Sequence, residues 1–210
     1  MKRLTIASYF VLLFAVACNS EKKDTTSDSA KVDTAAAATT QVDTAAMNKA
    51  WAAYMTPGDA HKMMAAADGK WNAEITMYYS PDQPPSVNKA VCENKMILGG
   101  RYQQSAYKGS FEGMPFEGIS TLAYDNSKKI YVSTWVDNMG TGIMYLEGTF
   151  DAATKTMNMK GKATDVVSGK DITIRETMKF IDDNTQQMEM FDTKDGKEVK
   201  TMSINLKRAK

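Results

Sequence analysis

The sequence has little of the side-chain chemistry that marks common metal centres and catalytic sites. Its 210 residues include one His and two Cys. A zinc site built from Cys and His needs four such ligands, so one chain cannot supply it. A catalytic triad would depend on His61 alone, and no nucleophile–base pair or phosphate-binding loop is recognisable. We therefore expect neither an enzyme nor a bound metal or other cofactor.

A dominant charge is also absent. Lys and Arg number 26 against 25 Asp and Glu, which leaves a net charge of +1. A charge so close to zero gives no electrostatic reason to expect nucleic acid as a partner. What the chain does have is Met, in 16 copies, a flexible apolar side chain that lines adaptable surfaces or fills cores.

The first 17 residues have the features of a secretory signal peptide. Two basic residues precede an apolar run from Leu4 to Val16, which is shorter than the ~20 residues that a membrane-spanning helix needs. Ala15-Val16-Ala17-Cys18 resembles the lipobox of bacterial lipoproteins. The resemblance implies that Cys18 is lipidated and becomes the first mature residue. Asn19 after it implies an outer-membrane anchor in the cell envelope, on the periplasmic or the surface face.

Cleavage and lipidation would change the inventory of the mature chain. Loss of residues 1–17 removes Lys2 and Arg3 and no acidic residue, so the mature chain has 24 basic and 25 acidic residues, net −1. Cys18 is committed to the lipid thioether, which leaves Cys92 as an inert buried thiol. No intramolecular disulfide is therefore expected, even in an oxidising compartment.

Residues 18–46 have the composition of a disordered linker. No aromatic residue occurs between positions 19 and 46, and 16 of these 28 residues are Thr, Ala or Ser. Such a chain cannot bury enough apolar surface to offset its ordering entropy, although an Ala-rich helix over residues 35–38 is the competing interpretation. Four tripeptides that begin Asp-Thr or Asp-Ser resemble the O-glycosylation acceptor of Bacteroidetes. They would place sugars on Thr25, Ser29, Thr34 and Thr44.

The folded domain is expected over residues 47–210 and to begin with one or two short helices. Residues 47–55 place apolar side chains at the i, i+3, i+4, i+7 and i+8 spacing of one helical face. Thr56 is a candidate N-cap for a second helix that runs to about Asp68 and stops at Gly69. On this helix His61 is expected to face solvent.

After Gly69 the apolar period changes from helical to two. Nine turn signals then divide the chain into ten expected strands. The signals lie at residues 80–88, 99–100, 109–115, 125–126, 138–142, 151–154, 165–169, 182–184 and 195–196. Two of them, Gly99-Gly100 and Asp195-Gly196, fit two-residue primed hairpin turns.

Ten successive antiparallel strands form an up-and-down barrel or a sandwich. We favour an all-β, ten-stranded antiparallel up-and-down barrel, because the first and last strands are complementary. Trp71 opens the apolar face of the first strand, and Arg208 ends that of the last. If these strands pair antiparallel, Trp71 and Arg208 meet at one end, where the guanidinium can stack on the indole.

Gly69-Lys70-Trp71 and the late Arg resemble the Gly-x-Trp signature of lipocalin and calycin barrels. Four further segments resemble a bacterial family catalogued as domain of unknown function 1579, over about residues 57–208. They are Leu98–Tyr102, Gly113–Gly118, Tyr124–Asn126 and Thr134–Gly142, with Ala123 where a Gly usually precedes the Tyr-Asp pair. The resemblance implies a lipocalin-like fold and no established activity. Some calycin relatives bind haem through a barrel His, and His61 lies outside the expected strands, so no haem is expected.

A barrel of this size can hold one small ligand. On residues 130–137, either the set with Ile130 or the set with Trp135 and Asp137 can face inward. The second set lies in the strongest family motif and suits an apolar ligand, unless Trp135 simply fills the core. Glu176 lies among aliphatics, where it would pair with Arg101 or a Tyr hydroxyl, lie at a barrel mouth, or act in function. The expected ligand contacts are Tyr102, Tyr124, Tyr131, Trp135, Asp137 and Glu176.

The sequence therefore predicts a lipid-anchored envelope lipoprotein whose barrel binds a small apolar ligand. The alternative is an envelope interaction protein with a filled barrel and no ligand. In both hypotheses the lipid anchor provides the contact with the membrane.

Overall fold

The computed structural model describes residues 43–194 and 196–210. The predicted signal sequence, the lipidation site Cys18 and the acceptor candidates Thr25, Ser29 and Thr34 lie outside the described residues. Two helices precede the strands: α1, Thr44–Met55, and α2, Asp59–Ala65. Neither of these described helices is long and apolar enough to cross a membrane.

Helix α1 begins three residues before the predicted start at Met47. Asp43 is its N-cap, and Asp43 Oδ1 accepts the N–H groups of Ala45 and Ala46 at 3.0 and 3.1 Å. The predicted linker is therefore too long at its C-terminal end, and the acceptor candidate Thr44 lies in the first helical turn. The Asp of the last Asp-Thr-Ala tripeptide is a helix cap.

Helix α2 begins after Gly58, so the predicted N-cap at Thr56 is wrong. The Thr56 hydroxyl belongs to the end of α1, where it donates to the carbonyl of Ala52 at 2.6 Å. At the start of α2, His61 Nδ1 accepts the Gly58 N–H at 3.0 Å. The helix ends at Ala65, three residues earlier than expected.

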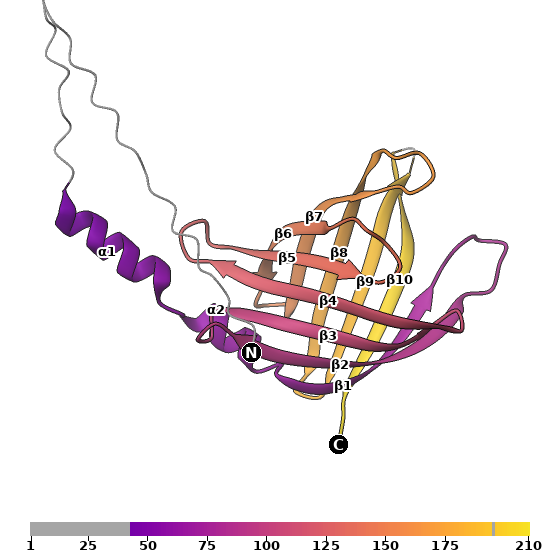
Figure 1. Cartoon of the computed structure of the whole chain (residues 1–210), viewed down its shortest axis with the longest axis horizontal. Helices are drawn as coiled ribbons and strands as arrows, with labels where there is room; N and C mark the ends of the chain where they lie inside the picture. The colour runs from indigo at the N-terminus through magenta and orange to yellow at the C-terminus, as the bar shows by residue number, and fades with distance from the viewer. Residues whose placement is uncertain (1–42, 195) are drawn as a thin grey trace, which may run out of the picture. The chain divides into compact units, whose positions relative to one another are not determined.

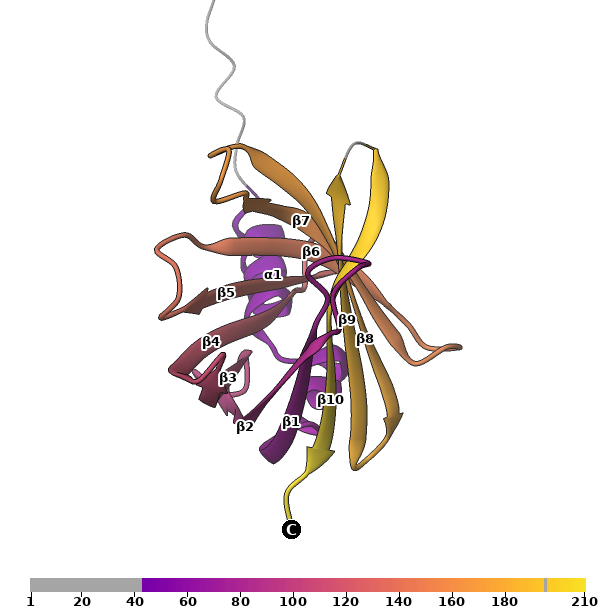
Figure 2. The ribbon, with the colours of Figure 1, turned by 90° about the vertical axis from the view of Figure 1, so that its right-hand side faces the viewer.

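Ten antiparallel strands form a closed barrel in chain order (Figure 1). Each strand pairs with its chain neighbours, and β1 pairs with β10 so that Trp71 lies opposite Arg208; Figure 2 shows these two strands side by side. The predicted all-β barrel is confirmed. The strands are β1 Gly69–Met77, β2 Ser86–Ile97, β3 Tyr102–Phe111, β4 Met114–Asp125, β5 Ile130–Asp137, β6 Met144–Asp151, β7 Thr156–Thr164, β8 Asp171–Asp182, β9 Thr185–Lys194 and β10 Lys197–Arg208.

All nine predicted breaks fall at observed connections, but one turn type is wrong. Between β2 and β3 the register runs from Ile97 to Tyr102, so the loop has four residues and not two. Leu98, Gly99 and Gly100 take φ of 49°, 69° and 79°, and the two glycines make this left-handed run accessible. Between β9 and β10, Lys194 pairs with Lys197, which leaves the predicted two-residue connection.

The buried apolar side chains form two clusters inside the barrel. One lies on β1–β4 and β10 around Trp71 and Tyr107, and the other lies on α2 and β5–β8 around Tyr131 and Leu146. The half-buried Met178 packs against both clusters. The buried side chains thus form two groups that the half-buried Met178 connects.

Candidate functional site

Helix α2 and the segment after it pack against one end of the barrel, on the side of β1, β2, β3 and β10; we call it the closed end. Trp71 is fully buried there, and its Nε1 donates to the carbonyl of Ala67 at 2.9 Å. The guanidinium of Arg208 lies over the indole, with Cζ 4.3 Å from the ring centroid. It also donates to the carbonyls of Asp68, Ala66 and Asp183 at 2.6, 2.9 and 3.0 Å. The stack of Arg208 on Trp71 that the sequence predicts is thus present, and it joins β1 to β10.

Polar side chains of β2 and β3 add further bonds at the closed end. Gln103 Nε2 donates to the carbonyl of Met64 at 2.5 Å and to Asp68 Oδ1 at 2.9 Å. Asn94 Nδ2 donates to the carbonyl of Ala67 at 3.1 Å, and the Met96 N–H donates to Asp68 Oδ2 at 2.9 Å. The backbone that follows α2 is therefore bonded to the barrel wall along its length.

His61 belongs to the closed end, so its predicted exposure to solvent is wrong. Its side chain is 5% exposed, and its ring meets that of Tyr124 edge-on at 6.0 Å. Burial and the nearby charge of Arg101 lower the pKa of His61. The error arose because the ring's partner comes from β4, far along the chain.

The inward phase of β5 is the one with Tyr131, Ser133, Trp135 and Asp137. Trp135 packs between Tyr107 and Phe116, with ring-centroid distances of 5.4 and 6.3 Å. A Cβ at Gly118 would lie 2.4 Å from this indole, so the glycine makes room for the ring. Trp135 is therefore a wall of the interior, packed on one side and half-buried overall.

Asp137 orients Trp135 and the turn that follows β5. Its Oδ2 accepts the indole N–H of Trp135 at 2.7 Å, and its Oδ1 accepts the N–H groups of Met139 and Gly140 at 2.9 and 3.1 Å. The Asp137 carboxylate, expected as the polar group beside Trp135, thus already accepts hydrogen bonds from that ring and from the turn after β5. A positioning role fits Asp137 better than direct ligand contact.

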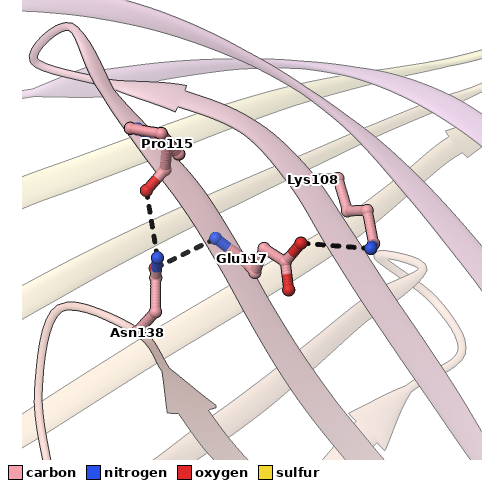
Figure 3. Close-up of polar contacts among 4 residues, drawn as sticks. All are labelled: Lys108, Pro115, Glu117 and Asn138. Atoms are coloured by element: carbon pink, nitrogen blue, oxygen red, sulfur yellow. Dashed lines mark hydrogen bonds and ion pairs between the residues drawn. The ribbon is translucent and has the colours of Figure 1, made fainter.

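The adjoining Asn138 ties the two strongest sequence motifs together, as Figure 3 shows. Its Oδ1 accepts the Glu117 N–H and its Nδ2 donates to the Pro115 carbonyl, both at 3.0 Å. Lys108 Nζ reaches the Glu117 carboxylate at 3.1 Å from β3. These motif residues secure β3, β4 and the end of β5 from outside the barrel, so their first role is structural.

Of the three predicted tyrosine contacts, one faces the wrong way. Tyr102 is 37% exposed and alternates with the inward Gln103, which puts it on the outer surface, so its prediction as a lumen contact is wrong. Tyr124 and Tyr131 do face inward, at the closed end, with ring centroids 4.8 Å apart. Burial, and secondarily Tyr124, raise the pKa of Tyr131 to about 12. This pair lines the floor of the interior beneath α2.

Glu176 lies at mid-height on the inward face of β8. In the strand register it is flanked by Met159 of β7 and Met190 of β9, with Ile174 and Met178 before and after it on its own strand. Among the described residues it has no hydrogen bond or ion pair. Burial raises the pKa of its carboxyl to about 7.

Neither structural partner considered for Glu176 is bonded to it. Arg101 is exposed in the loop between β2 and β3, and its Nη1 donates to the carbonyl of Leu98 at 3.2 Å. The position is also not a barrel mouth, because Glu176 is the sixth residue of a twelve-residue strand. The carboxyl is thus an unpaired acid in the middle of the barrel.

Tyr107 is the residue that the sequence reasoning missed. It is 8% exposed, contacts Trp135, and pairs in register with Cys92 on one side and Gly118 on the other. Burial raises the pKa of Tyr107 well above its usual value, and the charges of Cys92 and Glu176 raise it further. Tyr107 therefore links the Trp135 wall with the Glu176 wall. The sequence gives no clear signal for this position, because Gln103 and Ser105 on the same face of β3 are polar.

Cys92 lies on the β2 side of the same group. Its Sγ donates to Asn94 Oδ1 at 3.1 Å, and burial raises the pKa of the thiol to about 11. A thiol held protonated in this way is a poor nucleophile, which agrees with the inert role expected for it. Within the described residues, no group of three or more His, Cys, Asp or Glu is placed to hold a metal ion.

Solvent has access to the inner wall. In a closed barrel the outer side of an inward residue is covered by backbone, so partial exposure of its side chain reports space inside or at the ends. Several inward side chains from the middle of the strands are only half-buried. They are Ser120, Ser133, Trp135, Glu176, Met178 and Met190.

A family model described as a protein of unknown function, DUF1579, matches residues 56–208. The chain belongs to the DUF1579 family. The match includes α2 and all ten strands and leaves α1 outside it. The DUF1579 barrel is similar to the crystal structure of Rv2717c from M. tuberculosis, with a TM-score of 0.54 and 11% identity over 74% of this chain and all of the other. At that identity the likeness concerns the fold alone. A search of the curated proteins returns no match.

Proposed function

We propose that this DUF1579 protein is a lipid-anchored lipoprotein of the cell envelope that holds one small apolar ligand inside its barrel, and that it is not an enzyme. The observation that carries the proposal is the half-buried inner wall at mid-barrel, which includes Met, Trp and Ser side chains and one carboxyl. Apolar walls with a few polar groups are what small-ligand sites generally have.

The closed end supports the same proposal. Helix α2 and its bonded polar groups cover the floor, so a ligand would enter between the loops at the opposite end and stop above Tyr124 and Tyr131. Three of the inward neighbours of Glu176 are Met159, Met178 and Met190, whose flexible side chains adapt to ligands of different shape. We expect a permissive apolar site.

The anchor is proposed from the amino terminus. The lipobox-like residues before Cys18 and the Thr/Ala/Ser-rich segment after it would tether the barrel at a distance on the order of 30 Å from the membrane. Growth with radiolabelled palmitate tests this step. The wild-type chain should take up label and the Cys18→Ser variant should not. In the same cells, alanine at Thr25, Ser29, Thr34 and Thr44 should lower the intact mass by the mass of the attached sugars in addition to that of the substituted side chains.

A second candidate function follows from α1. This helix has no buried residue, and it exposes Trp51, Tyr54 and Met55. An envelope interaction protein with a filled barrel would use such a surface to contact a partner. The two candidates differ in whether the barrel takes up a ligand.

The deciding experiment measures uptake of N-phenyl-1-naphthylamine, an uncharged lipophilic fluorophore, by the mature Cys18→Ser chain purified without detergent. We expect saturable binding at one site, with energy transfer from tryptophan because Trp135 lines the interior. Native mass spectrometry of the same sample should detect a co-purified lipophile. Absence of both the fluorophore and any lipophile would refute ligand binding and leave the interaction protein.

A further inference from the structure

The ionisable side chains that line the middle of the barrel are all acids. At the inward positions between its two ends, β1 to β10 carry no Lys, Arg or His among the described residues. Arg208 faces the interior only at the closed end, where three carbonyls and the Trp71 ring hold its guanidinium. Glu176 therefore has no cation of the protein to pair with.

The titratable groups that face Glu176 do not supply one either. Tyr107 on β3 and Cys92 on β2 hold their protons, since burial raises the pKa of both. On β9, Asp192 accepts a hydrogen bond from Thr201 Oγ1 at 3.1 Å, and on β5, Asp137 is bonded to Trp135. Every ionisable group around the space is thus an acid, and an anionic ligand would meet only repulsion there.

An apolar wall around one unpaired carboxyl favours a particular ligand chemistry. A half-buried carboxylate with Met159, Met190, Ile174 and Met178 as neighbours loses part of its hydration, and no hydrogen bond or ion pair among the described residues replaces it. A cation brought by the ligand would restore that interaction, and Tyr107, which the charge of Glu176 reaches, adds an aromatic ring of the kind that attracts cations, packed against that of Trp135. The charge and the apolar chain of such a ligand would both find a partner.

We propose that the ligand of this barrel is an amphiphilic amine, whose ammonium group pairs with Glu176 and whose hydrocarbon part lies against the methionine and aromatic walls. The inference rests on the proposed uptake of a ligand into the barrel. The ligand therefore has a cationic head group, and fatty acids are not the preferred class of ligand.

The test compares three ligands with the same twelve-carbon chain: dodecylamine, dodecanol and dodecanoate. Each competes with N-phenyl-1-naphthylamine on the mature Cys18→Ser chain at pH 8, below its critical micelle concentration. We expect dodecylamine to bind at least ~10-fold more tightly than dodecanol, with dodecanoate weakest. In Glu176→Gln the advantage of the amine should disappear, while the affinity for dodecanol changes less than ~2-fold.

Two controls make the result specific. Glu74→Gln removes an exposed carboxyl from the outer face of β1 and should leave the preference for the amine intact. In the wild type, lowering the pH from 8.5 to 5.5 protonates Glu176 and should weaken dodecylamine binding by about the same factor that Glu176→Gln does, roughly 10-fold, because the amine stays charged over this range. Glu176→Gln should show little change.

The outcomes separate the two proposals. Equal affinity for the three ligands, or a preference for the amine that survives in Glu176→Gln, overturns the amine inference while uptake of the fluorophore still supports a ligand barrel. If neither the fluorophore nor any dodecyl compound binds, the ligand barrel itself is refuted and the amine inference with it.

Discussion

The closed end and the middle of the barrel treat polar groups in opposite ways. At the closed end, the buried Gln103 and Asn94 and the guanidinium of Arg208 each donate to a backbone carbonyl. In the middle, the carboxyl of Glu176 has no hydrogen bond or ion pair among the described residues. Both regions are lined by the same ten strands, so the contrast comes from side chains and not from the fold.

The difference separates what holds the barrel together from what it can do. Buried polar groups that serve stability are almost always paired, because an unpaired one destabilises the native state. Glu176 differs from these groups, because it is half-buried and has no hydrogen-bond partner among the described residues, and such an exception inside the barrel is a candidate for function. The contrast therefore predicts changes of opposite sign in the free energy of unfolding. Substitutions at the closed end should destabilise the protein, and neutralising Glu176 should stabilise it.

The largest effect is expected for Trp71→Ala. The indole is fully buried, stacks under Arg208 and donates to Ala67, so its loss should lower the free energy of unfolding by ~3–5 kcal/mol in urea titrations. Trp51→Ala is the matched control, because Trp51 on α1 is 55% exposed; it should change stability by less than ~0.5 kcal/mol. Similar losses of stability in Trp71→Ala and Trp51→Ala would show that the closed end does not stabilise the barrel.

Glu176→Gln should act in the other direction and depend on pH. The folded state holds the proton of Glu176 up to about pH 7, whereas the unfolded chain releases it near 4.5. Stability is therefore lost as the pH rises from 4.5 to 7, and the loss persists above 7. Replacing the carboxyl by an amide should raise the free energy of unfolding at pH 8 by up to about 3 kcal/mol. At pH 4 the two proteins should be equally stable.

Urea titrations of both proteins at pH 4, 6 and 8 check this sign. A wild type that is the more stable protein at pH 8 would mean that Glu176 has a stabilising partner. The unpaired acid would then belong to the same structural class as the closed end, and the contrast between the two regions would fail.

The barrel could be predicted from the sequence because its determinants are local. Alternation of apolar residues, nine turn signals and the complementary ends at Trp71 and Arg208 each depend on short segments, and together they leave one topology. Glu176 was found for a similar reason, since it is the one acid in a strongly apolar phase of residues 172–180. Its lack of a partner could not be predicted, because that depends on residues from four other strands.

Two of the errors, at His61 and on β3, concern residues whose surroundings come from distant segments. His61 is buried because β4 brings Tyr124 against it, and nothing near position 61 indicates this contact. The inward face of β3 was not recognised because it carries the polar residues Gln103 and Ser105. Gln103 is hydrogen-bonded to α2, and Ser105 is only half-buried. That error placed Tyr102 inside and overlooked Tyr107.

A smaller effect is expected for Arg208→Lys at the closed end. Lysine keeps the charge but cannot reproduce the planar stack or donate to the carbonyls of Ala66, Asp68 and Asp183 together. We expect a loss of ~1–2 kcal/mol in the same titrations. Lys207→Ala, at the exposed neighbouring position, should have almost no effect. If the two substitutions proved equally harmless, the stack and the three donated hydrogen bonds of the guanidinium would not stabilise the seam between β1 and β10.

The smallest effect is expected where paired polar groups are exposed to solvent. Asn126 Nδ2, in the loop between β4 and β5, donates to the carbonyls of Ala53, Tyr54 and Thr56 at the end of α1, at 3.3, 3.0 and 2.8 Å. Asn126→Ala should speed amide hydrogen exchange in α1 by up to ~5-fold and change global stability by less than ~1 kcal/mol, because water replaces the lost donor. Ser127→Ala should leave exchange in α1 unchanged. A large global loss in Asn126→Ala would show that burial is not what separates strong polar contacts from weak ones here.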